Sequence, residues 1–200
     1  ERIEFLISSW DSNSETSSIN QNAGIKPVKV SKELWDLIDR SQQISKITSG
    51  AFDLTFAAVD RIWKFDGSDV EMPNADLILA SVSKIGYHQI QLNEKKSTVF
   101  LPEKGMKIGF GAIGKGYAAD RAKQLLMARG VVGGIINASG DINTWGTQPD
   151  GSPWTIGIIN PMNKEKVFSW FSLEHNAVVT SGNYEKFVRI GGKRYSHIID

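Results

Sequence analysis

The segment Ile108-Gly-Phe-Gly-Ala-Ile-Gly-Lys-Gly-Tyr-Ala-Ala-Asp120 decides how the fold around it is interpreted. Four glycines fall between Gly109 and Gly116, and a helical pattern follows at once. Glycine lets a backbone turn sharply and approach a ligand closely, and a helix N-terminus offers free N–H groups that suit phosphate. We therefore predict a strand, a phosphate-handling loop and a helix in that order. A plain strand-to-helix turn with Lys115 in solvent is the alternative, and the segment alone leaves both open.

Composition and motif spacing disfavour several classes of protein. Lys115 is followed by Gly116, so this is not the loop of a Walker-type nucleotide triphosphatase. Lys and Arg number 23 against 22 Asp and Glu, without a basic run, so no nucleic-acid partner is expected. The chain has no cysteine, which removes disulfides, thiol catalysis, zinc–thiolate and iron–sulfur sites. No apolar run approaches the length of a membrane span.

The chain has the length and apolar content of one domain. Its 200 residues are 40% hydrophobic, which is enough to build a core. It starts at Glu1 without a signal-like segment and stops at Asp200, in what the pattern predicts to be the end of a strand. We therefore expect a single domain over residues 1–200 that is truncated at both ends.

Helical patterns are concentrated in the first part of the chain, and strand patterns dominate after Gly86. Helices are predicted over 32–48 with Ser31 as N-cap, over a segment ending at Trp63, and over 74–84 with Asn74 as N-cap candidate. A further helix is predicted after the glycine segment, with Gly130 at its C′ position. Strands are predicted near 87–92, 97–101, 106–110, 131–137, 142–146, 154–159, 167–173, 176–180, 187–190 and 193–199. The strands at 87–92 and 97–101 are expected to form a hairpin, and Gly191-Gly192 is expected to join the last two. The expected fold class is α+β, with a largely antiparallel sheet, flanking helices, and the helices concentrated in the N-terminal part.

Three further clusters could carry chemistry, and each also has a purely structural explanation. Asn137-Ala-Ser-Gly-Asp141 could complete a pocket beside the glycine segment, or it could be a plain turn. Thr180-Ser-Gly-Asn-Tyr184 and Tyr195-Ser-His197 offer hydroxyls and a histidine, but no G-x-S-x-G elbow supports a serine hydrolase. Ser49-Gly-Ala-Phe-Asp53 is either a helix C-cap or a wall for a planar ligand. With three histidines in the chain, a dense histidine metal site is disfavoured.

Taken together and in order, the sequence blocks resemble the ApbE family of flavin transferases. The blocks are Gly50-Ala-Phe-Asp-Leu-Thr55, Trp63, Ala112-Ile-Gly-Lys-Gly-Tyr-Ala-Ala-Asp120, Asn137-Ala-Ser-Gly-Asp-Ile142, Pro153-Trp-Thr-Ile-Gly157, Thr180-Ser-Gly-Asn-Tyr184 and Ser196-His-Ile-Ile-Asp200. The resemblance covers almost the whole chain. The ordered set is specific, although each block alone is not.

The resemblance implies an activity. Enzymes of this family take FAD, use Mg²⁺, transfer FMN to a Ser or Thr hydroxyl of a target protein, and release AMP. An FAD pyrophosphatase that gives FMN and AMP is an alternative, and a non-catalytic flavin-binding module is another. The family also implies a periplasmic or cell-envelope location, often with a lipidated N-terminal tether that this chain does not include.

The resemblance also assigns flavin-binding residues. It places Ala51, Phe52 and Asp53 against the flavin nucleotide, and Lys115 near the phosphates or ribose, where a cation helps to neutralise charge. It places Ile198 at a flavin-contact position. Attack on a pyrophosphate requires charge neutralisation and an aligned hydroxyl more than a covalent enzyme intermediate, which fits this assignment.

The resemblance also assigns one residue to metal binding and one to removal of a proton from the acceptor hydroxyl. By resemblance the backbone carbonyl of Ala112 binds the metal, which suits hard Mg²⁺, and His197 assists deprotonation of the acceptor hydroxyl. Asp141 and Tyr184 are expected to support the pocket.

Two departures from the family pattern affect these expectations. The family often has Asp-Leu where this chain has Gly109-Phe110, so a side-chain contact to FAD is not expected there. The acidic metal ligand of the family and its Thr partner lie beyond the segment that ends here at Asp200. We therefore expect the 200-residue chain to lack much of its metal site.

Overall fold

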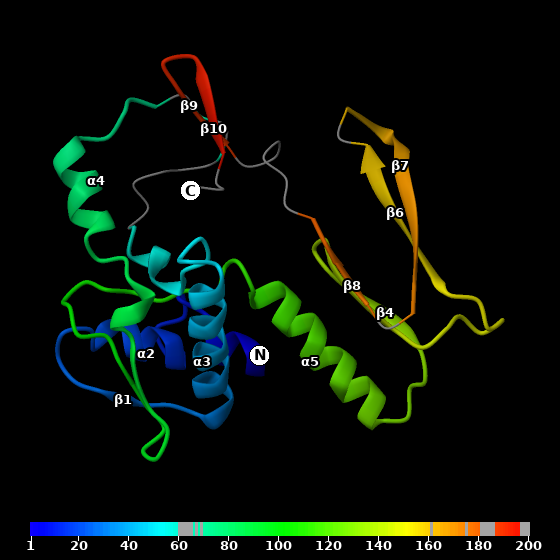
Figure 1. Ribbon diagram of the computed structural model, residues 1–200, viewed down its shortest axis with the longest axis horizontal. Coiled ribbons are helices and arrows are strands. Elements are labelled where there is room, and N and C mark those ends of the chain that lie inside the picture. The colour runs from blue at the N-terminus through cyan, green and yellow to red at the C-terminus, as the bar shows by residue number, and fades with distance from the viewer. Residues whose placement is uncertain are drawn as a thin grey trace. The chain divides into compact units, whose positions relative to one another are not determined.

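The computed structural model describes residues 1–59, 66, 68, 70–160, 162–174, 176–180 and 187–196 (Figure 1). The chain forms two compact units, one made of Glu1–Phe110 with Lys186–Asp200 and the other of Gly111–Glu185. They are called unit 1 and unit 2 below, and each is described by itself. The single domain expected over 1–200 stays a prediction. Within the described ranges, no helix is long and apolar enough to cross a membrane.

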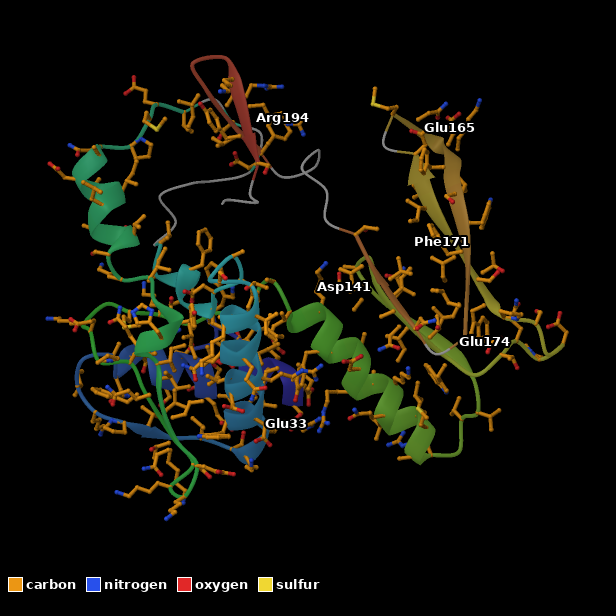
Figure 2. All side chains as sticks on the ribbon, in the orientation of Figure 1. Glu33, Asp141, Glu165, Phe171, Glu174 and Arg194 are labelled. Atoms are coloured by element: carbon orange, nitrogen blue, oxygen red, sulfur yellow. The ribbon has the colours of Figure 1, made fainter. Side chains whose placement is uncertain are left out.

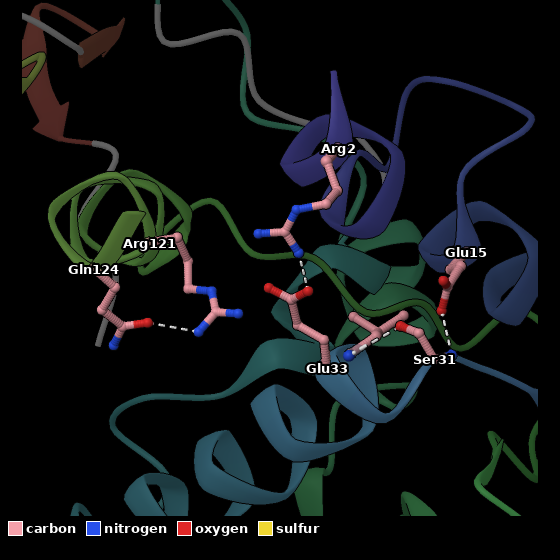
Figure 3. A network of polar contacts seen from close by, with 7 residues as sticks. Arg2, Glu15, Ser31, Glu33, Arg121 and Gln124 are labelled. Atoms are coloured by element: carbon pink, nitrogen blue, oxygen red, sulfur yellow. Dashed lines mark hydrogen bonds and ion pairs between the residues drawn. The ribbon is translucent and has the colours of Figure 1, made fainter. Parts of the chain in front are cut away.

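Three helices begin unit 1, namely α1 (Arg2–Ile7), α2 (Glu15–Gln21) and α3 (Lys32–Ile47). Ser31 caps α3 by accepting a hydrogen bond from the Leu34 N–H at 3.2 Å, as the sequence predicts. The Ser31 N–H donates in turn to the Glu15 carboxylate at 2.7 Å, which ties α2 to the start of α3 (Figure 3). Arg2 of α1 also pairs with Glu33 (Figure 3). The N-terminus of α3 is therefore anchored to both preceding helices.

The apolar face of α3 builds much of the core of unit 1. Leu34 and Ile38 are fully buried, whereas Ile47 in the last turn of the helix is 83% exposed. The core residues of unit 1 are Leu6, Ile19, Ala23, Val30, Leu34, Trp35, Leu37, Ile38, Leu54, Ala58, Ile90, Val99, Leu101, Met106, Ile108, Phe110 and Val188. The helix predicted over 32–48 is confirmed, and its last turn extends past the core of unit 1.

The middle of unit 1 contains shorter elements than predicted. A 3-10 helix, η1 (Leu54–Ala58), occupies the start of the second predicted helix, and the rest of that helix, with Trp63, lies outside the described residues. Helix α4 (Ala75–Val82) follows its predicted Asn74 cap, whose side chain accepts from the Asp76 N–H at 2.7 Å. The predicted strand at 87–92 starts as a second 3-10 helix, η2 (Tyr87–Gln89).

Unit 1 contains two small antiparallel sheets. The first has strand order β1-β3-β2, from β1 (Val28–Lys29), β3 (Thr98–Phe100) and β2 (Gln91–Asn93), and it confirms the predicted hairpin. The second pairs β9 (Phe187–Ile190) with β10 (Lys193–Ser196) across Gly191-Gly192, again as predicted.

The strand predicted at 106–110 is wrong. Met106, Ile108 and Phe110 are buried in alternation, which produced the strand-like pattern. The backbone of Ile108, however, exchanges both of its hydrogen bonds with the Asn20 side chain, at 2.8 and 3.0 Å, and the Gly109 N–H donates to the Leu54 carbonyl at 3.0 Å. A side-chain amide therefore satisfies the backbone that a neighbouring strand would otherwise satisfy.

Unit 2 places helix α5 (Gly114–Ala128) against a three-stranded antiparallel sheet of order β4-β5-β8 (Figure 1). The strands are β4 (Gly134–Ala138), β5 (Asp141–Trp145) and β8 (Ala177–Val179). The helix ends at Arg129, and Gly130 follows with φ +85°, as its predicted C′ position requires. A long two-stranded ribbon, β6 (Trp154–Asn160) and β7 (Asn163–Leu173), completes the unit.

The fold class is α+β, as predicted. All described strand pairs are antiparallel, and the α-helices α1 to α4 precede residue 83, with α5 following the glycine segment. In the described part of the chain the strands belong to four small sheets rather than to one extensive sheet. Most of these pairings join strands that follow one another in the sequence, so most of the strand contacts are made within hairpins.

Candidate functional site

The glycine segment forms a turn at residues 111–113 that leads into α5, and its helical half is as predicted. The N-cap position is Ile113, whose side chain makes no capping hydrogen bond. The first N–H groups of a helix have no partner inside the helix. Because an isoleucine side chain cannot accept hydrogen bonds, the start of α5 has no side-chain cap at Ile113, which suits solvent or an anionic ligand at these N–H groups.

Lys115 lies in the first turn of α5 and forms an ion pair with Asp141. Its ammonium is 2.9 Å from the Asp141 carboxylate and 3.2 Å from the Ser139 carbonyl. The Asp141 side chain is 6% exposed, whereas that of Lys115 is 47% exposed. The buried carboxylate therefore fixes a cation that still faces solvent, so the simple alternative of a fully solvated lysine is excluded.

The turn that carries Asp141 has a defined geometry. Ser139 and Gly140 have φ values of +53° and +96°, and Ala138 pairs with Asp141 across the turn. Two successive positive φ values in a two-residue loop are typical of a tight β-hairpin. The Gly140 N–H donates to the Asn137 side chain at 2.8 Å. The turn is therefore structural, and it also presents Asp141 to the start of α5, where Figure 2 labels it.

A second polar cluster joins α5 to β5, and the sequence analysis missed it. The Lys123 ammonium donates to the Asn143 side chain at 2.9 Å and to the Thr144 carbonyl at 2.8 Å. The Asn143 amide also donates to the Asp120 carboxylate. Asn143 is two residues after Asp141, so both project from the same face of β5. This pattern of polar residues two apart in a buried strand was the available signal.

In unit 1 the predicted flavin-binding segment forms a strained loop after α3. Ser49 and Gly50 have φ values of +53° and +90°, and a positive φ is uncommon for serine. The Phe52 N–H donates to the Thr48 hydroxyl at 3.2 Å. Ala51 is exposed and Phe52 is half-buried. The loop therefore presents these two residues at the surface of unit 1.

Asp53 closes this loop through hydrogen bonds within the protein. One carboxylate oxygen accepts from the Thr55 N–H at 2.7 Å and from the Thr55 hydroxyl at 2.6 Å. The other accepts from the Tyr87 N–H at 2.9 Å, and the buried Thr55 hydroxyl accepts from the Gly86 N–H at 2.7 Å. In this arrangement the Asp53 side chain holds the loop against η2.

The remaining predicted residues have different outcomes. His197, Ile198 and Tyr184 lie outside the described residues, so their roles stay predictions. Ala112 lies in the exposed turn before α5. The Ala51–Asp53 segment belongs to unit 1, whereas Ala112 and Lys115 belong to unit 2, and their membership of one shared site also stays a prediction.

The described residues contain no cluster of three or more His, Cys, Asp or Glu side chains that would hold a metal ion on its own. Mg²⁺ takes oxygen ligands in near-octahedral geometry. A carbonyl such as that of Ala112 suits it chemically, but one backbone oxygen supplies only one ligand.

Comparison with known proteins identifies the group to which the chain belongs. A model described as the ApbE family matches residues 1–200. The FAD:protein FMN transferase of Klebsiella pneumoniae (strain 342) is 32% identical over 200 residues, which are 100% of this chain and 61% of that protein. The chain thus spans about three-fifths of the length of this relative.

Two solved structures share the fold over nearly the whole chain. The crystal structure of an ApbE protein from Thermotoga maritima has a TM-score of 0.88 at 32% identity, covering 100% of this chain and 64% of that one. The apo form of the flavinyl transferase ApbE from Pseudomonas stutzeri has a TM-score of 0.83 at 28% identity, covering 98% and 61%. With a family match from the first residue to the last, the chain belongs to the ApbE family.

Proposed function

We propose that the protein is an FAD:protein FMN transferase. Its relative from Klebsiella pneumoniae carries that name, and the similar Pseudomonas stutzeri protein is a flavinyl transferase. The observation that carries the proposal is the Lys115–Asp141 pair at the uncapped start of α5. A fixed, solvent-facing cation beside free helix N–H groups suits the pyrophosphate of FAD.

In the proposed reaction a Ser or Thr hydroxyl of the acceptor protein attacks the phosphorus on the FMN side of the FAD pyrophosphate. A bond forms between the hydroxyl oxygen and this phosphorus, the bond from phosphorus to the bridging oxygen breaks, and AMP leaves. His197 takes the proton of the hydroxyl, as the family resemblance implies. Lys115 and the α5 N–H groups stabilise the negative charge on the phosphoryl oxygens.

The loop at 51–53 supports the flavin end of the substrate in this proposal. Ala51 and Phe52 form the contacting surface, Asp53 holds that surface in shape, and Ile198 supplies a further contact by resemblance. Lys115 acts on the phosphates.

Mg²⁺ dependence is part of the proposal and rests on the family resemblance. When bound, Mg²⁺ would neutralise charge on the pyrophosphate. Ala112 would contribute its backbone carbonyl, and further oxygen ligands would be needed beside it, because the described residues hold no group of three or more acidic or histidine side chains. A periplasmic or cell-envelope location with a lipid tether, and an acceptor protein that carries the flavinylated Ser or Thr, complete the proposal.

Flavin fluorescence in denaturing gels tests this function. The protein, expressed from its complete gene, is incubated with FAD, Mg²⁺ and an extract of its host, and covalently flavinylated bands are excised and mapped. We expect a fluorescent band that requires FAD and disappears with EDTA. Formation of FMN and AMP without a labelled band would support the pyrophosphatase instead. Tight FAD binding without any turnover would support a flavin-binding module.

A further inference from the structure

Helix α5 and strand β5 are joined by two polar contacts along one line of the helix. Lys115, Ala119 and Lys123 follow one another at intervals of four residues, so they lie on one face of α5. Asp141 and Asn143 are two residues apart and project from one face of β5. Lys115 pairs with Asp141 at 2.9 Å, and Lys123 pairs with Asn143 at 2.9 Å. One contact therefore lies at the start of the helix and the other about two turns later.

The apolar residue between these contacts defines the position of the helix only weakly. Ala119 is 2% exposed, so it is packed, but its side chain is a single methyl group. A large side chain fills a specific hole in the facing surface, whereas a methyl group leaves the helix more freedom to rotate or slide. Hydrogen bonds depend on distance and direction, so the polar contacts on either side of Ala119 supply the missing definition.

The Asn143 amide makes contacts at both of its ends. Its oxygen accepts a hydrogen bond from the Lys123 ammonium at 2.9 Å, and its nitrogen donates to the Asp120 carboxylate. An ammonium only donates and an ionised carboxylate only accepts, so the amide has a single favourable orientation. Lys123 also donates to the Thr144 carbonyl at 2.8 Å. Two residues of α5 are thus tied to β5 through one asparagine, which is 7% exposed.

These contacts also restrain the first turn of α5. A buried polar group without a partner is unfavourable, so a shift of α5 that separates Asn143 from its partners is opposed. The helix is continuous from Gly114 to Ala128, so a restraint at Lys123 is passed along it to Lys115. The Lys115 side chain is 47% exposed. Its location therefore depends on where the helix is held.

We propose that Asn143, through Asp120 and Lys123, is a positioning residue that sets the place of the Lys115 ammonium. This inference rests on the proposed function, in which Lys115 and the start of α5 face the phosphates of FAD. A misplacement of about 1 Å can cost about 10²-fold in the rate of an enzyme. Asn143 itself touches no substrate in this proposal and acts on the reaction through α5.

An exchange of the amide and the carboxylate tests the proposal. Asn143→Asp alone places two carboxylates against each other, and their repulsion replaces the hydrogen bond to Asp120. Asn143→Asp/Asp120→Asn restores the contact, because the carboxylate at position 143 accepts from Lys123 and from the amide at position 120. Thr16→Val is the control in unit 1. It removes the buried hydrogen bond from the Thr16 hydroxyl to the Leu6 carbonyl, 2.6 Å long, and leaves α5 and β5 unaltered.

Flavin transfer is measured for these variants and for Asn143→Asp combined with Lys115→Ala, and hydrogen exchange of the α5 amides is followed in parallel. We expect Asn143→Asp to lower the transfer rate about tenfold and to speed amide exchange in the first turns of α5. The exchanged double variant should recover both properties, and Thr16→Val should keep both. In Lys115→Ala the same Asn143→Asp change should alter the rate by less than about twofold, because it acts through Lys115.

Equal transfer rates in wild type and Asn143→Asp would overturn the proposal, and so would an exchanged variant that folds without recovering. A similar loss in the Lys115→Ala background would show that Asn143 supports the fold alone. If circular dichroism shows that Asn143→Asp does not fold, Asp120→Ala replaces it. Asp120 is exposed, and its loss should lower the rate about threefold.

Hydrogen exchange separates this proposal from the proposed function because it requires no turnover. If wild type transfers no flavin, the enzyme activity is refuted, and the α5 amides still report on the restraint. Unchanged amide exchange in Asn143→Asp would then refute the positioning role as well.

Discussion

Asp53 and Asp141 both lie in segments that the sequence assigns to nucleotide binding, but the structure uses them differently. Asp53 accepts hydrogen bonds from the Thr55 N–H, the Thr55 hydroxyl and the Tyr87 N–H, all within unit 1. Asp141 pairs with the half-exposed ammonium of Lys115. The Asp53 carboxylate therefore stabilises a loop, whereas the Asp141 carboxylate positions the charged side chain of Lys115. Loss of the first should reduce stability, and loss of the second should reduce activity.

The largest expected effect is that of Lys115→Ala on flavin transfer. Removal of a preorganised charge that stabilises a transition state typically costs about 10²–10³-fold in rate. Because Lys115 is 47% exposed but Asp141 is only 6% exposed, loss of the lysine leaves a buried carboxylate without its cation and should lower the free energy of unfolding by about 1–2 kcal/mol. Transfer rates and urea unfolding measure the two quantities. Lys107→Ala, in unit 1, is the control, and a normal rate in Lys115→Ala would remove this residue from the site.

Asp53→Ala should have the largest effect on stability. It leaves the Thr55 hydroxyl and the N–H groups of Thr55 and Tyr87 without their acceptor, which costs about 2–4 kcal/mol. Urea denaturation measures this cost. Asp53→Asn keeps one carbonyl oxygen as an acceptor and should lose less. If Asp53→Ala unfolds like wild type but no longer binds FAD, Asp53 contacts the substrate directly and the contrast with Asp141 fails.

The sequence predicts α3, α4, the helical half of the glycine segment and the two tight hairpins because local signals decide them. Ser31 and Asn74 are caps whose hydrogen bonds span two or three residues. The strand predicted at 106–110 fails because Asn20, far away in sequence, supplies its hydrogen bonds. No periodicity in a short segment reveals such a distant partner.

In the candidate site, too, local features can be predicted from the sequence, whereas contacts between distant residues cannot. The ordered blocks are sufficient to predict the family, and the glycine segment is sufficient to predict that Lys115 opens a helix. The pairing of Lys115 with Asp141 depends on how α5 packs on β5, which also creates the Lys123–Asn143 contact. The structural role of Asp53 depends on η2, more than thirty residues later in the chain. Tertiary packing therefore decides which acidic residue faces a charge and which one supports a loop.

Asp141→Asn should have an intermediate effect. The amide can still accept a hydrogen bond from Lys115, but without the negative charge the ammonium is held less firmly. We expect the transfer rate to fall about tenfold, since a hydrogen bond to a charged acceptor contributes roughly 1–1.5 kcal/mol more than one to a neutral amide. In Lys115→Ala the same substitution should have little further effect, because the two residues act as a pair. Additive losses in the double variant would show that Asp141 acts independently of Lys115.

Gly116→Ala, in the first turn of α5, should have the smallest effect on FAD binding and on stability. A methyl group there would lie 3.6 Å from the Asp141 carboxylate, an ordinary contact, so the fold should tolerate it. Alanine favours a helix over glycine by up to about 1 kcal/mol, so the free energy of unfolding should stay equal or rise slightly. If the α5 N–H groups bind the FAD phosphates, the added methyl group hinders the approach of the phosphates to these N–H groups. FAD affinity should then fall a few-fold, measured by quenching of flavin fluorescence.

Gly130→Ala, at the other end of α5 with φ +85°, is the control and should instead lower stability and leave FAD affinity unchanged. Unchanged affinity in Gly116→Ala would place the phosphates away from this turn and leave Lys115 as the contact from α5.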